Sequence, residues 1–534
     1  MRSPSFFASR QPLVALFLSW FLTAAVSHAF AQNVLTYHNN NSRSGLNSAE
    51  TTLTLTNVNS ASFGKLFTVP VDGLVDAEPL YLSAVPISGT NHNLLIVATE
   101  HDSVYAFDAD NGTPLWHIST LKSGETTSDD RGCSQVTPEI GITSTPVISR
   151  PKGSNGVIYT VAMSKDSSGN YHQRLHALDA TTGNELFKGP VDIMAKYPGT
   201  GDGSSGGFVI FDPAQYEERS GLLLLSGKLY LSWTSHCDIR PYTGWIMEYN
   251  PLTLAQGSVL NVTPNGNEGS IWGAGAGPAA DGLGNIYFLD ANGIFDNSLN
   301  SNGFPSSGDY GNAFVKLSTK NGLAVSDYFE MDNGQQESNG DVDLGSGGAI
   351  LLPNMKDSSG TTWQLAAGAG KDSNLYIVNR NNMGKFNSNS NNIYQELDGV
   401  LPGGIWSMPA FYEGRLYYGP VSQPILEFKF KNVKLSTSPV AQTVNAFGYP
   451  GATPSISSNG GTNGIVWAAE NTNPAVLHAY NALTLQELYN SNQASGGRDH
   501  FGAGNKFITP MIINGKVYVG TTNGVGVFGI LGGK

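Results

Sequence analysis

The sequence predicts an all-β protein, an eight-bladed β-propeller whose ring is closed by an N-terminal strand that completes the last blade. Three observations lead to this prediction. The composition, with 64 glycines in 534 residues and 13% charged residues, is typical of many short strands joined by tight turns. A short hydrophobic pattern recurs eight times along the chain. The last repeat lacks a fourth strand, and an unassigned strand stands near the N-terminus.

The chain begins with the pattern of a secretory signal peptide. Two arginines precede an apolar stretch over 13–26, and an Ala-Phe-Ala sequence ending at Ala31 supplies the small residues that signal peptidase needs. The apolar stretch is shorter than the roughly 20 residues of a membrane-spanning helix. We therefore expect a signal peptide over 1–31, cleaved after Ala31, and a secreted or periplasmic protein of residues 32–534 without a transmembrane segment.

The repeated segment has the form Gly-x-aliphatic-aromatic in its clearest copies. In chain order, the eight copies lie at 93–99, 156–162, 227–233, 284–290, 363–369, 414–420, 464–470 and 515–521. A small-x-Pro motif, which suits the first residue of a strand, stands before most copies, and an alternating segment with a hairpin turn follows most of them. Each unit therefore predicts four strands, which is the content of a propeller blade.

These units give one domain with eight blades. The last unit ends in its third strand at 524–530, and the strand at 64–73 would supply the missing fourth, because closure of the ring removes exposed sheet edges. The Asn-rich stretches 38–42 and 387–392 are predicted to be solvated loops. We expect the blades at approximately 76–120, 141–193, 219–262, 271–329, 344–398, 404–443, 447–492 and 501–531.

Two segments, 104–116 and 175–187, share the pattern aliphatic-Tyr-Ala-Phe/Leu-Asp-Ala-x-x-Gly-x-x-Leu-Trp/Phe, or a close variant of it. This pattern resembles the repeat of the quinoprotein alcohol dehydrogenase-like superfamily, the pyrroloquinoline quinone (PQQ) repeat propellers, and the resemblance extends over essentially all of 32–534. The superfamily includes PQQ-dependent dehydrogenases, scaffold lipoproteins of outer-membrane assembly and secreted propellers without a known reaction. The resemblance therefore predicts a fold of the PQQ-repeat type and leaves the function open.

The resemblance implies PQQ and calcium as the cofactors to consider. PQQ enzymes of the superfamily typically carry two adjacent cysteines that form a disulfide against the cofactor, and this sequence has no Cys-Cys pair. It also lacks the C-x-x-C-H motif that attaches haem. Asp341 and Asp343 loosely resemble part of a calcium loop, but they stand in a predicted turn. We therefore predict no certain cofactor and assign no metal ligand.

The two cysteines, Cys133 and Cys237, are 104 positions apart in the sequence. Export to an oxidising compartment would allow them to form a disulfide. In the predicted propeller both lie in loops of the same face, in blades 2 and 3, so a bridge between them is geometrically reasonable.

Loops between strands 2 and 3 of a blade, and loops between blades, share one face of a propeller around the central channel. Such loops are a usual place for a binding site. No catalytic residue can be assigned, but the acidic, basic and aromatic residues predicted at this face form a candidate ligand site: Glu139, His236, Asp238, Trp272, Asp290, Lys371, Asp372, Trp406 and His500.

Alternatives remain open for several of these residues. Trp272 and Trp406 would either stack on a ring or sugar, or pack between blades. His236 and Asp238 would either act as a ligand or acid–base pair, or flank a disulfide in a turn.

The charge of the chain argues against one class of partner. The net charge of −13 and the lack of a basic run argue against a nucleic-acid partner.

The leading hypothesis is a propeller that binds a small molecule, a carbohydrate or an envelope protein at its central face, without the usual PQQ site. Alternatives are an atypical quinoprotein dehydrogenase that oxidises an alcohol or sugar with PQQ and calcium, a polysaccharide-processing propeller, and an envelope assembly scaffold that recruits partners through the insertion 194–218. The sequence does not decide whether the protein is an enzyme.

Overall fold

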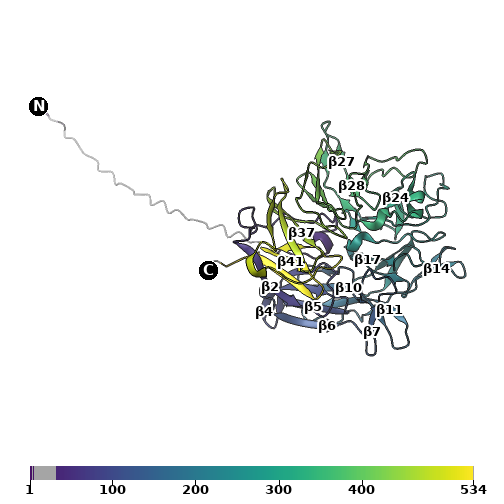
Figure 1. The fold of residues 1–534 in the computed structure, drawn as a ribbon, viewed down its shortest axis with the longest axis horizontal. Coiled ribbons are helices and arrows are strands. Elements are labelled where there is room, and N and C mark those ends of the chain that lie inside the picture. Colours follow the sequence, from purple (N-terminus) through teal and green to yellow (C-terminus); the bar gives the residue numbers. More distant parts are fainter. Residues whose placement is uncertain (3, 5–31, 533–534) are drawn as a thin grey trace. The chain divides into compact units, whose positions relative to one another are not determined.

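The computed structural model describes residues 1, 2, 4 and 32–532. The chain divides into a unit of residues 1–31 and a unit of residues 32–534. Most of the predicted signal peptide, with its cleavage site, lies outside the described residues. The second unit is an eight-bladed β-propeller, as predicted, in which the blades follow one another around a ring (Figure 1). No helix among the described residues is long and apolar enough to cross a membrane.

In the first four blades, strands that follow one another in the chain pair antiparallel. Blade 1 consists of β3 (Leu80–Ile87), β4 (Thr90–Ala98), β5 (Ser103–Asp108) and β6 (Pro114–Ser119). Blade 2 consists of β9 (Val147–Ser149), β10 (Val157–Lys165), β11 (Tyr171–Asp179) and β12 (Val191–Asp192). Blade 3 consists of β16 (Leu223–Leu225), β17 (Lys228–Ser232), β19 (Trp245–Tyr249) and β20 (Gln256–Asn261). Blade 4 consists of β21 (Ala279–Ala280), β22 (Asn285–Leu289), β23 (Phe314–Ser318) and β24 (Ala324–Phe329).

The other four blades repeat this order. Blade 5 consists of β25 (Ile350–Leu351), β28 (Leu365–Gly368), β29 (Leu375–Asn379) and β30 (Gln395–Leu397). Blade 6 consists of β31 (Ala410–Tyr412), β32 (Arg415–Tyr418), β33 (Leu426–Lys431) and β35 (Ala441–Gln442), with β34 (Lys434–Leu435) beside β33. Blade 7 consists of β36 (Ser455–Asn459), β37 (Thr462–Glu470), β38 (Val476–Asn481) and β39 (Glu487–Asn490). Blade 8 consists of β40 (Met511–Ile513), β41 (Lys516–Gly520), β42 (Gly524–Ile530) and β2 (Phe63–Pro70).

Short elements fill the loops between these sheets. The pairs are β7 (Thr126–Asp129) with β8 (Glu139–Ile140), β13 (Lys196–Pro198) with β14 (Phe208–Ile210), β15 (Tyr216–Glu217) with β18 (Thr234–Ser235), and β26 (Met355–Lys356) with β27 (Thr362–Trp363). The helical turns are η1 (Tyr37–Asn39), η2 (Gly273–Gly275), α1 (Gly334–Asn339), η3 (Leu344–Ser346) and η4 (Ser495–Gly497).

The ring closes as the missing fourth strand predicts. β2 pairs antiparallel with β42, with Phe63 opposite Ile530 and Pro70 opposite Gly524. Phe63 is fully buried and packs its ring against Trp467 of blade 7 and Phe528 of blade 8. The N-terminal strand therefore joins the last blade to the body of the ring through both hydrogen bonds and apolar contacts.

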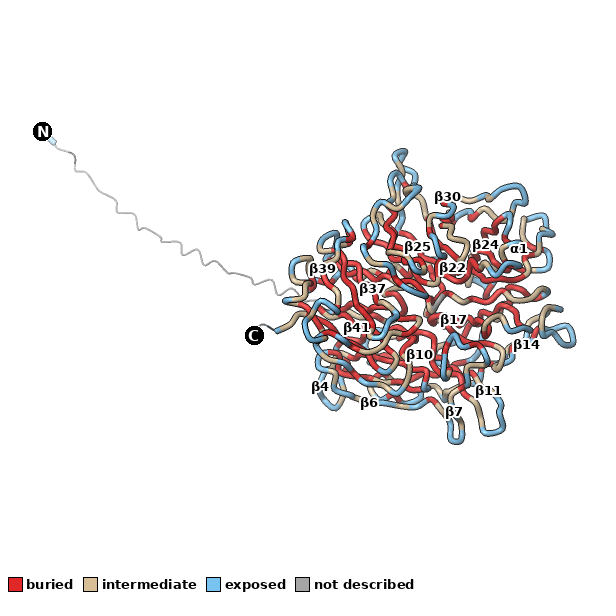
Figure 2. The backbone as a smooth tube through the Cα atoms, viewed as in Figure 1, coloured by how far each residue is buried: buried red, intermediate tan, exposed pale blue. Residues whose placement is uncertain are grey.

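The first strand of each blade is its inner strand. In blade 1 most of the inner strand is buried, whereas every residue of the fourth strand is exposed or half-buried. Figure 2 shows the same gradient, with buried chain along β17, β22 and β37 and exposed chain in peripheral hairpins such as that of β14. Buried apolar clusters join neighbouring blades, so the core lies between the sheets around the whole ring.

Residues 33–47 form a belt that contacts the inner strands of all eight blades in order. The first contact is the backbone pair of Val34 with Tyr81 in blade 1. The remaining hydrogen bonds join the belt to Ile148, Leu224, Ala280, Leu351, Phe411, Ile456 and Ile512, which are the inner-strand residues of blades 2 to 8. The last two residues of the belt form β1 (Leu46–Asn47), which runs parallel to β36.

The belt corrects the prediction of a solvated loop at 38–42. His38 is buried, with its ring nitrogens 2.9 Å from the Arg43 carbonyl oxygen and 3.0 Å from that of Pro454. Gly45 has a positive φ of +64°, and a β-carbon there would lie 2.4 Å from the His38 ring. The polar side chains of this segment bond to one another and to backbone oxygens of the belt and the blades, which composition alone cannot reveal.

Candidate functional site

A cavity of about 300 Å³ lies where loops from seven of the eight blades converge. Most lining residues stand in the chain shortly before an inner strand, and the others follow the second strand of a blade. Both kinds of loop share one face of a propeller, which explains why residues far apart in sequence meet here. The aromatic lining consists of Trp272, Trp406, Tyr449 and Phe507. The polar lining includes Gln135, Arg219, Asp238, Asp341, Asp343, Ser346, Lys371 and Lys506.

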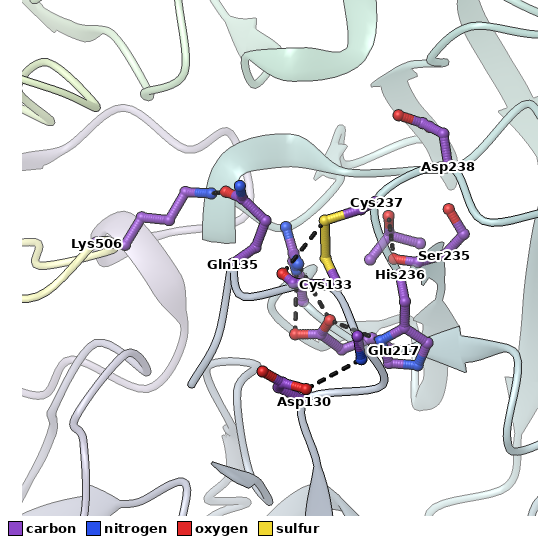
Figure 3. The surroundings of a disulfide bond; sticks show 12 residues. Asp130, Cys133, Gln135, Glu217, Ser235, His236, Cys237, Asp238 and Lys506 are labelled. Atoms are coloured by element: carbon purple, nitrogen blue, oxygen red, sulfur yellow. Dashed lines mark hydrogen bonds and ion pairs between the residues drawn. A yellow bond between two sulfur atoms is a disulfide. The ribbon is translucent and has the colours of Figure 1, made fainter. Parts of the chain in front are cut away.

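A disulfide between Cys133 and Cys237 forms part of the cavity wall. Their Cα atoms are 5.3 Å apart, and the bond joins the loop that precedes blade 2 to the turn after β18. In Figure 3, Gln135 and Asp238 lie near its two ends. A bridge that closes so long a chain segment stabilises the fold by roughly 4–5 kcal/mol in the chain-entropy model. It therefore fixes two lining loops relative to each other.

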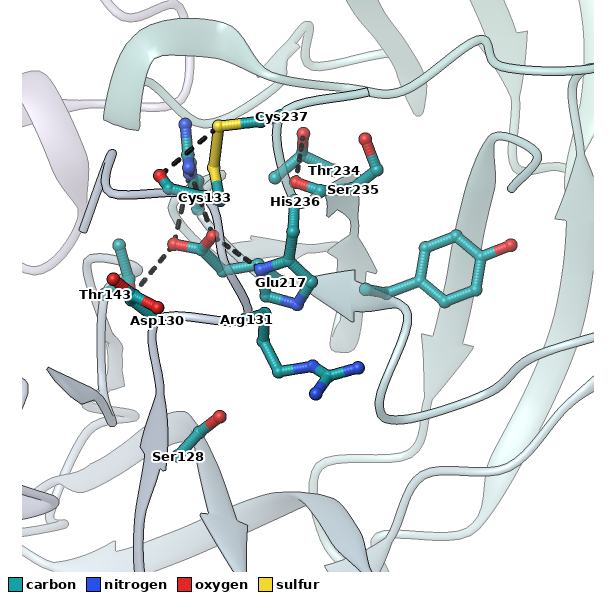
Figure 4. A network of polar contacts seen from close by, with 12 residues as sticks. Ser128, Asp130, Arg131, Cys133, Thr143, Glu217, Thr234, Ser235, His236 and Cys237 are labelled. Atoms are coloured by element: carbon teal, nitrogen blue, oxygen red, sulfur yellow. Dashed lines mark hydrogen bonds and ion pairs between the residues drawn. A yellow bond between two sulfur atoms is a disulfide. The ribbon is translucent and has the colours of Figure 1, made fainter. Parts of the chain in front are cut away.

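A buried ion pair of Glu217 and Arg219 lies next to the disulfide, and Figure 4 shows the Glu217 carboxylate near Cys133. The Arg219 guanidinium Nε lies 3.1 Å from a Glu217 carboxylate oxygen, and Nδ1 of His236 lies 3.4 Å from the other oxygen. Burial alone would raise the pKa of Glu217, but the Arg219 charge and the His236 contact lower this pKa to about 2. Glu217 therefore stays ionised and holds Arg219 beside the cavity.

The aromatic side chains surround this guanidinium and a neighbouring ammonium group. The Arg219 guanidinium lies 4.8 Å from the Trp272 ring and 5.7 Å from the Phe507 ring. Trp406 and Tyr449 meet nearly edge to face, with ring centroids 6.2 Å apart. Within the described chain, the Trp272 indole N–H is buried without a hydrogen-bond partner. The walls thus offer flat apolar surfaces together with unused N–H donors.

The two lysines of the cavity differ in their surroundings. The Lys371 ammonium lies 2.6 Å from an Asp341 oxygen and 2.5 Å from an Asp343 oxygen, so its charge is compensated. Burial acts to lower the pKa of Lys371, but the carboxylates of Asp343 and Asp341 raise this pKa overall.

Lys506 has no carboxylate oxygen within 4.0 Å among the described residues. It donates a hydrogen bond to the Gln135 side-chain oxygen and lies 5.3 Å from the centroids of both the Tyr449 and Phe507 rings. Burial and the nearby Arg219 charge lower the pKa of Lys506 to about 7.

Four residues of the predicted ligand site line the cavity: Asp238, Trp272, Lys371 and Trp406. The Asp238 carboxylate accepts a hydrogen bond of 2.6 Å from the Tyr242 hydroxyl, and no cation lies within 4.0 Å of it in the described chain.

The other five predicted residues lie outside the cavity lining. Glu139 contacts His101 at 3.0 Å, and His236 is buried against Glu217. The Asp290 carboxylate is fully buried, and burial raises its pKa well above the usual range. Asp372 accepts a hydrogen bond from Tyr376, and His500 is exposed. The structure therefore brings four of the nine predicted residues together in the cavity lining.

Arg219, Lys506, Gln135, Tyr449, Phe507 and Ser346 line the cavity but were not among the predicted ligand residues. The sequence carries a usable signal for Tyr449 and Lys506, which share it with the predicted residue Trp406. Trp406, Tyr449 and Lys506 stand three to five residues before Pro409, Pro454 and Pro510, which mark the beginning of an inner strand. A search of that window in each repeat would have found both lysine and aromatic residues of the site.

The fold is similar to that of solved quinohemoprotein alcohol dehydrogenases and of a methanol dehydrogenase. The chain is similar to the quinohemoprotein alcohol dehydrogenase of Comamonas testosteroni, with a TM-score of 0.61 and 14% identity over 94% of this chain and 81% of that chain. A quinohemoprotein alcohol dehydrogenase of Pseudomonas putida HK5 gives 0.62 and 13% over 94% and 81% of the two chains. A europium-containing methanol dehydrogenase gives 0.62 and 11% over 93% and 98%.

These likenesses confirm the predicted PQQ-repeat fold and, at such identities, show the fold alone. The amino-acid sequence matches no protein-family model and no curated protein. Activity therefore has to be argued from the residues of the cavity.

Proposed function

We propose that the protein binds a small, flat ring compound bearing carbonyl or carboxylate oxygens in its central cavity. The observation that carries this proposal is the combination of four aromatic walls with converging cationic donors. Arg219, Lys371 and Lys506 have more N–H groups than their protein partners occupy. A ring would stack on the aromatic side chains while its oxygens accept these hydrogen bonds.

PQQ is one compound of this class, since it is a flat quinone with three carboxylates. The cavity residues fit such a group: Trp272 and Trp406 would hold the rings, and Arg219, Lys371 and Lys506 would bind the oxygens. When bound, the quinone supplies an acceptor for two electrons from an alcohol. Asp238, a cavity carboxylate free of a cation, would take the hydroxyl proton.

Calcium has weaker support than the quinone. Among the described residues, no group of three or more His, Cys, Asp or Glu side chains is arranged to hold a metal ion. Asp341 and Asp343, the pair that resembles part of a calcium loop, are bound by Lys371. No step is therefore assigned to a metal.

We also propose that the protein works outside the cytoplasm, as a secreted or periplasmic protein. The Cys133–Cys237 disulfide supports this location, because such bonds persist in oxidising compartments. Carbohydrates and envelope proteins remain alternative partners.

Ligand-dependent thermal unfolding tests the proposal. PQQ or benzene-1,4-dicarboxylate, at about one hundred times its Kd, should stabilise the native protein by ~2.7 kcal/mol. The Trp272→Ala variant should lose most of this stabilisation. A matched control, Trp363→Ala, changes a tryptophan that bonds to Asp357 away from the cavity and should keep it. Stabilisation by oligosaccharides but by neither ring compound would overturn the proposal.

A further inference from the structure

Lys506 differs from the other lysine of the same cavity because no carboxylate oxygen of the described residues lies within 4.0 Å of its amine. Lys371 is held between two aspartates, whereas the Lys506 amine meets an uncharged amide and two aromatic rings. A lysine in such surroundings loses the usual stabilisation of its ammonium form, which is how proteins prepare a nucleophilic amine. The contrast lies within one pocket, so a general property of the surface does not explain it.

The charges that face Lys506 come from several blades. Arg219 and Lys371 repel a proton on this amine, and Glu217 and Asp76 attract it. Burial is the largest influence and lowers the pKa, with Arg219 next, so the amine is half neutral near pH 7. An exposed lysine, with a pKa near 10.4, would have roughly a thousandfold less neutral amine at that pH.

We propose that the Lys506 amine binds ligands covalently by forming an imine with an aldehyde or ketone group. The proposal rests on the proposed function, because it requires the ring ligand to occupy the central cavity. It also specifies the ligand further, as a flat ring compound with an acid group and a reactive carbonyl. Arg219, beside the amine's aromatic surroundings, would bind the acid group.

The reaction balances without an oxidant or a reductant. The lone pair of the neutral amine attacks the carbonyl carbon, so a C–N bond forms and the carbonyl oxygen takes a proton. The resulting carbinolamine loses water as its C–O bond breaks, and the nitrogen loses its remaining proton to give the C=N bond. Gln135 accepts a hydrogen bond from the amine and would orient its lone pair. Lys506 is partly exposed, so water can leave.

Reductive trapping tests this inference. The protein of residues 32–534 is incubated with 4-formylbenzoate and cyanoborohydride between pH 5 and 10, and modified peptides are identified by mass spectrometry. We expect one dominant adduct, at Lys506, with half-maximal formation near pH 7. The Lys506→Arg variant, which keeps the charge, should lose this adduct. The control Lys228→Arg, at a partly exposed lysine that is paired with Glu248 and does not line the cavity, should retain it.

A ligand without a reactive carbonyl separates the two proposals. Benzene-1,4-dicarboxylate has a similar shape and should both stabilise the protein and block the adduct. If it stabilises the protein while labelling spreads over many lysines and rises up to pH 10, the imine inference is wrong and the binding site stands. If neither compound stabilises the protein and 4-formylbenzoate does not label Lys506, both proposals fail.

Discussion

At the scale of single residues, the molecule places several ionisable groups where water cannot reach them. Glu78 is one such group: it is buried and accepts a 2.6 Å hydrogen bond from the His38 backbone N–H. Burial raises the pKa of Glu78 to about 8, although the His38 N–H and Arg43 oppose this shift. The pKa of Glu218 is raised to about 8 for the same reason.

We predict that stability falls as pH rises from about 4.5 to 8. In this window the unfolded chain has released the Glu78 proton while the native state still holds it, so rising pH favours unfolding. The midpoint of thermal unfolding should therefore be higher at pH 5 than at pH 8, and Glu78→Gln should reduce that difference.

Asp357→Asn is the control for this prediction. Hydrogen bonds from Ser359 and Trp363 lower the pKa of Asp357 to about 2, so its linkage acts below pH 4. This variant should keep the wild-type slope between pH 5 and 8. An equal slope in Glu78→Gln would show that Glu78 is ionised in the native state.

At the scale of elements, the belt of residues 33–47 depends on one fully buried arginine. Arg43 donates hydrogen bonds to the Thr36 hydroxyl and to the backbone oxygens of Tyr37, Leu222 and Pro278. The bonds to Leu222 and Pro278 connect the belt to the residues immediately before the inner strands of blades 3 and 4.

Arg43→Met should destabilise the protein by roughly 3–5 kcal/mol, because several buried oxygens lose their donor. The urea concentration at the unfolding midpoint measures the effect. Arg240→Met makes the same exchange at an exposed pair with Asp202 and should cost about 1 kcal/mol or less. Equal effects of the two variants would show that the belt contributes little.

The sequence repeats identify the strands but do not identify the side chains of the cavity, and the reason is physical. A second strand such as β41 is a short run of β-branched and aromatic residues after a turn glycine, and the sequence displays this run directly. Lys506 and Gln135 meet across 371 positions, in irregular loops without a periodic pattern. The sequence could place both in loops at the correct face, but which side chains turn inward depends on the neighbouring blades.

At the scale of the whole molecule, stability depends on closure of the ring. The reason is that each blade packs against its neighbours, so part of the ring does not form a separate core. β2 joins the start of the described chain to its end, and its buried Phe63 also contacts Tyr489 of blade 7. Loss of this side chain would leave a cavity between blades 7 and 8. The stability of blades 7 and 8 is thus linked to a residue that precedes the first blade.

Phe63→Ala should therefore lower the free energy of unfolding by roughly 3–5 kcal/mol. Phe208→Ala, in the exposed hairpin of β14, removes the same atoms from a partly solvated position and should cost far less. Urea unfolding followed by tryptophan fluorescence compares the two variants, because Trp467 lies next to Phe63. If blades 7 and 8 lose structure before the others in Phe63→Ala, closure acts locally; a single shifted transition means that the ring unfolds as one body. We expect the single transition, since apolar clusters join neighbouring blades around the ring.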